Sequence, residues 1–283
     1  TPCGTLFPYT TLFRSVQRQF VDMLFPGKAP NRIPIFSVSG SKGKNLAVNM
    51  IHQCLLENDI YSGVVSRNGL YIANRCMKKG DMTDSKSTEI VLKDPTIECA
   101  IFETPVETIL NSGIGYTFAD FGLVLNLHEN KEEYYRHDHI RDIYDIAYAK
   151  SVVAEEVFDH GYTVLNADQE LVYEMSERLY SNLALFSRNS ENEFIAEHLT
   201  NNGVCILLNK GNIIIKQGEK QTAFGNVSEI PLLDEALHDY YYDSTLAAII
   251  SLYLFGIETE KIKACLAKFT WEEGLAEKRL KQT

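Results

Sequence analysis

A short segment rich in glycine and lysine follows an apolar run near the start of the chain. Its residues are Ser39, Gly40, Ser41, Lys42, Gly43, Lys44 and Asn45. Glycines allow backbone N–H groups to approach phosphate oxygens closely, and a helix that begins here adds the partial positive charge of its N-terminus. Lys44 can reach the outer phosphates. The pattern therefore predicts a loop, from Gly40 to Asn45, that binds a nucleoside triphosphate.

Two features of this loop depart from the usual pattern, G-x-x-x-x-G-K-[ST]. The stretch between its glycines is shorter, consisting of Ser41 and Lys42, and Asn45 replaces the Ser or Thr that binds Mg²⁺. Taken alone, such a short match is also typical of an ordinary glycine turn. The apolar run before it, residues 33–38, predicts a strand, and the apolar residues after it have helical spacing, so the context favours nucleotide binding.

Strand-like runs and helical patterns alternate along the rest of the chain. Further strands are expected at residues 61–65, 98–103, 121–126, 162–165 and 183–186. Helices are expected at residues 143–158, 171–180, 243–255 and 258–269. Asp168 is a plausible N-cap for the second of these helices, and residues 203–218 read as a hairpin. Such alternation predicts an α/β fold in which a mostly parallel sheet carries helices on both faces.

Three separated polar features should meet at one edge of this sheet. The glycine loop, Glu103 and Asn126 each follow an apolar run. Ligands of open parallel sheets bind at the carboxyl ends of the strands, so these features are expected to share one crevice. Glu103 could bind Mg²⁺, which prefers oxygen ligands and is often held by one carboxylate together with phosphates. The alternative for Glu103 is a solvated glutamate at the end of a strand.

Lys150 is a lysine within a nearly apolar helical stretch, residues 146–153. One explanation is a side chain at the helix edge that extends its ammonium group to water. A second candidate for special chemistry is His137-Asp138-His139, which looks like a metal-binding pair. Its neighbours Tyr135, Arg136 and Arg141 favour a solvated polar loop instead.

Composition limits the classes of partner. The chain has 283 residues, 45% hydrophobic and 23% charged, which suits one large domain or two smaller ones. A formal net charge of -11 argues against a nucleic-acid partner, whereas local amides and lysines can still bind a small anion. No segment is long and apolar enough to cross a membrane. The six cysteines form no C-x-x-C pair, which favours a reduced cytoplasmic interior.

Several ordered motifs resemble the Mur-ligase-type half of the cyanophycin synthetases. The glycine loop stands where that family has G-T-N-G-K-T. The other matching segments are 21–26, 32–35, Gly80–Thr83, Asp94–Thr96, Glu103–Thr104, Ile109–Tyr116 and Leu165–Asp168. The block from Ile109 to Tyr116 is particular to cyanophycin synthetases among Mur-type ligases. It argues against a peptidoglycan or folate enzyme of the same type.

The resemblance implies an ATP-dependent amide ligase with a Mur ligase central ATP-binding domain. Such enzymes phosphorylate a carboxylate with ATP and let an amine attack the acyl phosphate, here joining arginine to the aspartate side chains of a polyaspartate. By position, Lys44 would bind phosphates, Glu103 would bind Mg²⁺ with the help of Asn45, and Lys150 would carry a carbamate that holds a second Mg²⁺. The implied partners are ATP and an amino-acid polymer, in a protein that could form a homo-oligomer.

The sequence also departs from this family at the expected site. Beside Asn45, residues 106–108 replace R-G-G, Asn130-Lys131 replaces the metal-associated D-H, and Tyr240–Ser244 replaces H-N-x-x-N near the adenine site. An asparagine binds Mg²⁺ weakly, and a protonated lysine cannot bind it. A second hypothesis is therefore a non-catalytic Mur-like domain with a structural or assembly role.

The resemblance also predicts domain boundaries. Residues 5–15 equal the in-frame translation of a common sequencing-library adapter, so we interpret residues 1–15 as an assembly artefact. Residues 16–32 would be a linker from a missing ATP-grasp domain. Residues 33–270 would form the central ATP-binding domain, and 271–283 a truncated tail before a missing C-terminal ligase domain.

Overall fold

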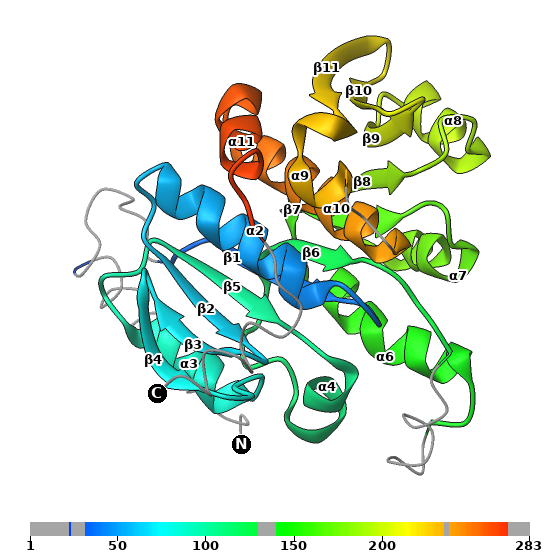
Figure 1. Ribbon diagram of the computed structural model, residues 1–283. Helices are drawn as coiled ribbons and strands as arrows, with labels where there is room; N and C mark the ends of the chain where they lie inside the picture. The colour runs from blue at the N-terminus through cyan, green and yellow to red at the C-terminus, as the bar shows by residue number, and fades with distance from the viewer. Residues whose placement is uncertain (1–22, 24–31, 130–139, 235–237, 271–283) are drawn as a thin grey trace, which may run out of the picture. The chain divides into compact units, whose positions relative to one another are not determined.

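A sheet of eleven described strands lies at the centre of the second of two compact units, Thr1–Ile33 and Pro34–Thr283 (Figure 1). The computed structural model describes residues 23, 32–129, 140–234 and 238–270. The strands are β1 (Ile35–Ser39), β2 (Ser62–Ser66), β3 (Gly69–Ile72), β4 (Arg75–Lys79), β5 (Cys99–Glu103), β6 (Ala119–Val124), β7 (Val157–Asn166), β8 (Asn182–Ser187), β9 (Val204–Asn209), β10 (Asn212–Gln217) and β11 (Lys220–Asn226). Their order across the sheet is β11-β10-β9-β8-β7-β6-β1-β5-β2-β3-β4.

The middle of the sheet is parallel and its two edges are antiparallel. Each neighbouring pair from β9 through β1 to β2 is parallel. β3 and β4 add to one edge, and β10 and β11 add to the other, as antiparallel strands. All five residues of β1 are buried, as expected for a parallel strand covered on both faces. The carboxyl ends of β6, β1 and β5 therefore lie side by side.

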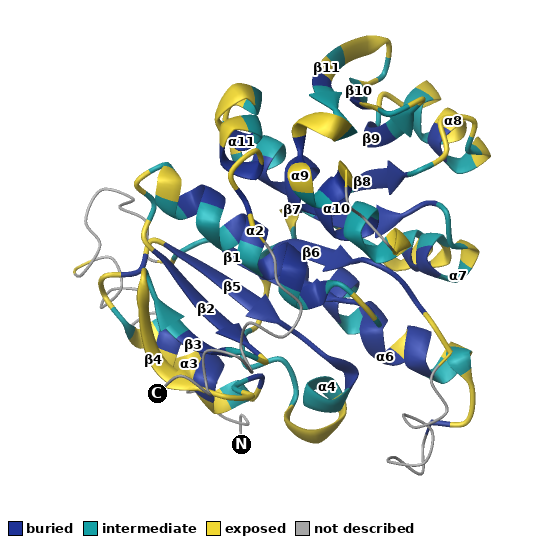
Figure 2. Ribbon diagram, in the orientation of Figure 1, coloured by how far each residue is buried: buried dark blue, intermediate teal, exposed yellow. Residues whose placement is uncertain are grey.

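Helices cover both faces of the sheet (Figures 1 and 2). They are α2 (Lys44–Glu57), α3 (Ser85–Lys93), α4 (Val106–Ser112), α6 (Ile143–Glu155), α7 (Glu170–Tyr173), α8 (Glu193–Thr200), α9 (Pro231–Asp234), α10 (Asp239–Phe255) and α11 (Thr259–Leu266), with the 3₁₀ helices η2 (Glu174–Arg178) and η3 (Val227–Glu229). One apolar cluster joins α2, α10 and α11 to the sheet, and a second joins α6, α7 and α8 to it. Consecutive residues of β6, Leu123 and Val124, belong to different clusters because side chains alternate across a strand. The predicted fold class is confirmed.

Several local predictions need correction. The helix predicted at 143–158 ends at Glu155, because Val157 already begins β7. The helix predicted at 171–180 is instead the short helix α7 followed by η2. Asp168 is not its N-cap: Gln169 holds that position, while the Asp168 carboxylate accepts hydrogen bonds from Ser187 Oγ (2.5 Å) and Arg188 N–H (2.7 Å). A partner from another strand therefore outcompetes the local helix for this carboxylate.

The hairpin predicted between Gly203 and Gly218 is present as β9 and β10. The antiparallel strands β3, β4 and β11 were not predicted. The residues of β4 are all exposed, so this strand lacks the apolar pattern that marks a buried strand. Within the described residues, no helix has the length and hydropathy required to span a membrane. The five described cysteines are free thiols, and only Cys76 among them is exposed.

Candidate functional site

The glycine loop connects the buried strand β1 to helix α2, as the sequence predicted. Gly43 is the N-cap of α2 and has a φ of 80°, a left-handed conformation that favours glycine. A Cβ atom at this position would clash with Ser244 Oγ and approach the Tyr240 carbonyl oxygen to 3.1 Å. Ser244 Oγ donates a hydrogen bond to the Gly43 carbonyl (3.0 Å). Helix α10 thus packs directly against the loop.

Lys44 is the first residue of α2, and its side chain returns over the loop. Its Nζ atom donates hydrogen bonds to the carbonyl oxygens of Gly40 (2.9 Å) and Ser41 (3.4 Å). The side chain is buried, with 8% of the residue exposed. A positive charge is therefore fixed at the N-terminus of α2, where the helix dipole also favours an anion.

Asn126 lies just after β6 and holds the loop through its side chain. Its Oδ1 atom accepts hydrogen bonds from the backbone N–H groups of Ser41 (3.2 Å) and Lys42 (2.9 Å). Its Nδ2 atom donates to the Lys42 carbonyl (3.2 Å) and to Asp243 Oδ2 (3.2 Å). Asn126 is fully buried. The sequence predicted that this residue lies near the loop, but its clamping contacts depend on the tertiary structure.

Glu103 ends β5 beside the loop strand, where it pairs in register with Val38 of β1. It is 3% exposed, so the solvated alternative is wrong. Its Oε2 atom accepts a hydrogen bond from the backbone N–H of Arg67 (2.9 Å). A carboxylate is thus held at the carboxyl end of β5, on the same side of the sheet as the loop and Asn126.

Lys150 extends from α6 to the loop. It is 1% exposed, which rules out the interpretation that it extends to water. Its Nζ atom donates a hydrogen bond to Ser41 Oγ (2.9 Å), and this hydroxyl also accepts one from the backbone N–H of His128 (3.0 Å). Burial, and then the positive charges of Lys42 and Lys150, lower the pKa of His128. Positive charge is therefore concentrated around the loop despite the acidic chain.

Asn45 lies in the first turn of α2, one residue after Lys44. Its backbone carbonyl accepts a hydrogen bond from Asn49 Nδ2 (2.7 Å), and this same nitrogen is hydrogen-bonded to Asn45 Oδ1. The amide oxygen that could contact a cation is thus already engaged by the neighbouring turn of the helix.

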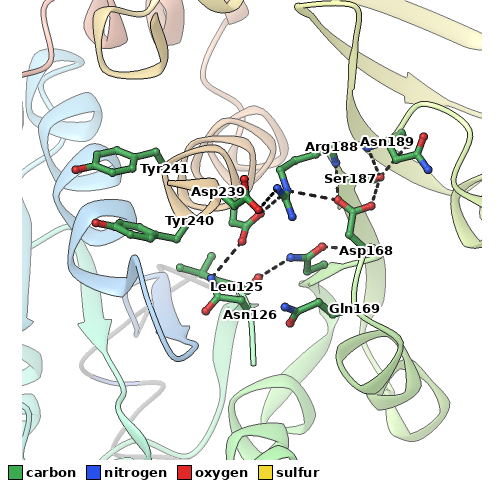
Figure 3. Close-up of polar contacts among 12 residues, drawn as sticks. Leu125, Asn126, Asp168, Gln169, Ser187, Arg188, Asn189, Asp239, Tyr240 and Tyr241 are labelled. Atoms are coloured by element: carbon green, nitrogen blue, oxygen red, sulfur yellow. Dashed lines mark hydrogen bonds and ion pairs between the residues drawn. The ribbon is translucent and has the colours of Figure 1, made fainter. Parts of the chain in front are cut away.

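An ion-pair network that was not predicted lies beside Asn126 (Figure 3). Arg188 lies 3.2 Å from Asp243 (Nε to Oδ1), 2.7 Å from Asp239 (Nη1 to Oδ2) and 3.7 Å from Asp168 (Nε to Oδ2). Asp243 is 3% exposed, and burial raises its pKa to about 6 although Arg188 opposes this effect. In the sequence, Asp243 stands at the start of an apolar helical run, and this signal could have identified Asp243 as unusual.

The segments where the sequence departs from the family motifs are only partly described. Glu107, in the segment 106–108, lies in the first turn of α4, and its carboxylate is 3.9 Å from the guanidinium of Arg67. Residues 130–139, which include Lys131 and the His137-Asp138-His139 segment, lie outside the described residues. Among the residues that the structure describes, no three His, Cys, Asp or Glu side chains gather into a metal-binding group.

Comparison with known proteins agrees with this architecture. Residues 38–222 match the family model of the Mur ligase middle domain. The chain is 33% identical to a cyanophycin synthetase of Geminocystis herdmanii over 262 residues, which are 93% of the chain and 30% of that protein. It is 34% identical to a cyanophycin synthetase of a Nostoc species over 256 residues, which are 90% of the chain and 28% of that protein.

A solved structure supports the same fold at low sequence identity. A UDP-N-acetylmuramoyl-L-alanyl-D-glutamate–2,6-diaminopimelate ligase aligns with a TM-score of 0.66 and 13% identity, covering 91% of this chain and 50% of that one. The chain spans less than a third of the length of the curated cyanophycin synthetases that it matches. The family model, by contrast, covers more than half of the chain. The chain therefore belongs to the Mur ligase middle domain family.

Proposed function

We propose that this chain is the ATP-binding part of an ATP-dependent amide ligase related to the cyanophycin synthetases. The observation that carries this proposal is the loop between β1 and α2, which receives the ammonium groups of Lys44 and Lys150. The buried Glu103 lies at the carboxyl end of the strand next to β1. In the whole protein, ATP would phosphorylate a carboxylate, and an amine would then attack the acyl phosphate. The resemblance to the cyanophycin synthetases implies arginine addition to a polyaspartate as the substrate chemistry.

The loop would bind the phosphates of ATP. Backbone N–H groups at the N-terminus of α2 and the ammonium group of Lys44 are suited to phosphate oxygens. Lys150 would add a second positive charge near Ser41. Neutralising phosphate charge in this way is the main protein contribution to phosphoryl transfer.

Mg²⁺ fits this site as an ion shared between protein and phosphates. Glu103 supplies one buried carboxylate at the sheet edge, and Mg²⁺ commonly takes one or two carboxylates together with phosphates and water. Asn45 fits less well, because its amide oxygen is already hydrogen-bonded to Asn49. When bound, the ion would neutralise phosphate charge. A carbamate on Lys150 would replace its positive charge with a negative one and provide a second oxygen ligand; this alternative state rests on the resemblance to Mur ligases.

The Glu103→Gln variant tests the metal assignment. Glutamine keeps an oxygen that can accept the Arg67 N–H but loses the negative charge. We expect Mg²⁺ to strengthen ADP binding about tenfold less in this variant than in the wild type, because about 1.4 kcal/mol of charge interaction is lost. Calorimetric titrations with and without Mg²⁺ measure this difference. An equal Mg²⁺ effect in both proteins would contradict the assignment.

Calorimetry of the wild-type chain with ADP and ATP tests nucleotide binding itself. We expect saturable binding with one site for either nucleotide and a stronger affinity when Mg²⁺ is present. The absence of binding heat, together with no nucleotide-dependent rise in the unfolding temperature, would refute the proposal. The substrate is tested on the longer protein, in which arginine-dependent ATP hydrolysis on a polyaspartate primer is expected.

A second candidate is a non-catalytic Mur-like domain with a structural or assembly role. The engagement of Asn45 by Asn49, at the position that binds Mg²⁺ in the usual loop, favours it. This candidate predicts that nucleotides bind to the chain but that the longer protein does not hydrolyse ATP when arginine and primer are added. The two candidates therefore differ in turnover rather than in fold. In either case the whole protein would include an ATP-grasp domain and a C-terminal ligase domain.

A further inference from the structure

We propose that Asp243, held by Arg188, is a positioning residue that orients the phosphate loop through Asn126. The inference rests on the proposed nucleotide site and assigns part of its geometry to residues far away in the sequence. Asp243 and Asn126 are separated by 117 positions, and the Asp243 carboxylate accepts a hydrogen bond from the Asn126 amide while it pairs with Arg188. The Asn126 amide thus connects the Asp243 side chain to the loop, separately from the contact between Ser244 and the Gly43 carbonyl.

The hydrogen bonds of Asn126 explain how this orientation works. Its Oδ1 atom accepts from two loop N–H groups, while its Nδ2 atom donates to the Lys42 carbonyl and Asp243 Oδ2. An ionised carboxylate can only accept hydrogen bonds, so it selects the amide orientation in which Nδ2 faces Asp243. Rotating the amide by 180° would bring its oxygen against the carboxylate and its NH₂ group against the loop N–H groups. Asp243 thus reinforces the amide orientation of Asn126 that the loop N–H groups and the Lys42 carbonyl also select.

Arg188 keeps this carboxylate in its ionised form. Burial disfavours the charged form of Asp243, and the nearby carboxylates of Asp168 and Asp239 add to that effect. Arg188 opposes them through its contact of 3.2 Å with Asp243, and its own position is fixed by Asp239 and by the hydrogen bond from its backbone N–H to Asp168. These three acids and one arginine come from α10 and from the ends of β7 and β8 (Figure 3).

Protonation of Asp243 should consequently loosen the loop. The pKa of Asp243 is raised to about 6, so the carboxylate is ionised at pH 7.5 and mostly protonated at pH 5. A protonated carboxyl group can present an O–H to Asn126 and no longer selects one amide orientation. The amide signals of Ser41 and Lys42 are therefore expected to shift with a midpoint near pH 6. His128 also titrates near the loop, so the wild type must be compared with a variant that lacks the Asp243 charge.

Nuclear magnetic resonance of the backbone amides tests the inference without any ligand. Three proteins are compared with the wild type: Asp243→Asn, Arg188→Leu and, as a matched control, Arg178→Leu. Arg178 also pairs with a carboxylate at 2.7 Å, that of Glu155, at another part of the fold. We expect Ser41 and Lys42 to shift in the first two variants but not in the control, and the pH 6 midpoint to disappear in Asp243→Asn. A midpoint that persists in this variant, or unchanged amide signals in both variants, would overturn the inference.

ADP calorimetry provides the functional readout. We expect Asp243→Asn and Arg188→Leu to weaken ADP binding about fivefold at pH 7.5, the effect of roughly one lost hydrogen bond, and the control to match the wild type. The wild-type affinity should also fall between pH 7.5 and 5.5, and this fall should be smaller in Asp243→Asn. If the loop amides respond as expected but ADP does not bind to the wild type, the positioning role stands and the proposed nucleotide function fails. If both variants unfold, the titration is made in His128→Gln, which removes the competing imidazole. The midpoint near pH 6 should then persist, and its loss would overturn the inference.

Discussion

Replacing Lys44 with alanine should weaken ADP and ATP binding by about 10- to 100-fold. The expected loss corresponds to about 1.5–3 kcal/mol, which is typical of hydrogen bonds made by a charged group. Lys44 is buried and its ammonium group is fixed over the loop by the carbonyl oxygens of Gly40 and Ser41. Little of its binding energy is therefore spent on ordering the side chain when phosphate arrives. Calorimetry at pH 7.5 with Mg²⁺ measures the change.

Lys42→Ala is the matched control for this prediction. Lys42 belongs to the same loop and carries the same charge, but its side chain is exposed. Its backbone N–H, which donates to Asn126, is retained in the variant. We expect the control to weaken binding by about threefold or less, because exposed charges contribute below about 1 kcal/mol. Equal losses in both variants would indicate a general electrostatic attraction and would contradict a specific role for Lys44.

Replacing Gly43 with alanine should cause the largest loss of stability at the site. Two costs add up: a left-handed conformation costs a residue with a Cβ about 1–2 kcal/mol, and overpacking a closed contact costs about 1–3 kcal/mol more. The new methyl group would clash with Ser244 Oγ, which is part of helix α10 and cannot move away without loss of its hydrogen bond to the Gly43 carbonyl. We therefore expect the free energy of unfolding to fall by about 2–5 kcal/mol, as measured by urea denaturation.

Gly256→Ala separates the two costs. Gly256 is also left-handed, with a φ of 104°, but a Cβ atom there would have no neighbour within 4 Å. This variant should lose only the conformational part, about 1–2 kcal/mol. If Gly43→Ala were no more destabilising than Gly256→Ala, the contact between the loop and α10 would be too loose to position the phosphate site. Such a result would also weaken the case for a coupling of α10 to the loop through Asp243 and Asn126.

The local arrangement of charges is compatible with the proposed phosphate site in an acidic protein. The net charge of -11 is distributed over the chain, whereas Lys44 and Lys150 both direct their ammonium groups to the loop. Asp168, Asp239 and Asp243 are grouped around Arg188. Charge interactions between exposed groups are screened within about 10 Å at moderate salt, so these local arrangements matter more than the total charge.

Sequence reasoning located the loop, Glu103 and Asn126 because strand ends in a parallel sheet share one edge. It also singled out Lys150 as unusual, since a lysine in an apolar helical run requires a partner or an outlet to water. It could not decide between these two possibilities. The 1% exposure of Lys150 and its contact with Ser41, 109 positions away, depend on how α6 packs against the sheet. Asp168 was misassigned for a similar reason, because its partners Ser187 and Arg188 lie at and just after the end of the next strand.

The amino-acid sequence by itself determined the α/β class, the phosphate-loop candidate and the strand ends that meet around it. These features follow from local periodicity and from glycines whose conformational requirements are short-range. Only the tertiary structure decided that Asn126 is hydrogen-bonded to the loop and that Asn49 is hydrogen-bonded to Asn45. It also decided that Asp243 accepts a hydrogen bond from Asn126 and pairs with Arg188. The orientation of a side chain is set by the partners that packing brings to it, and for Asn126 those partners come from positions far apart in the chain.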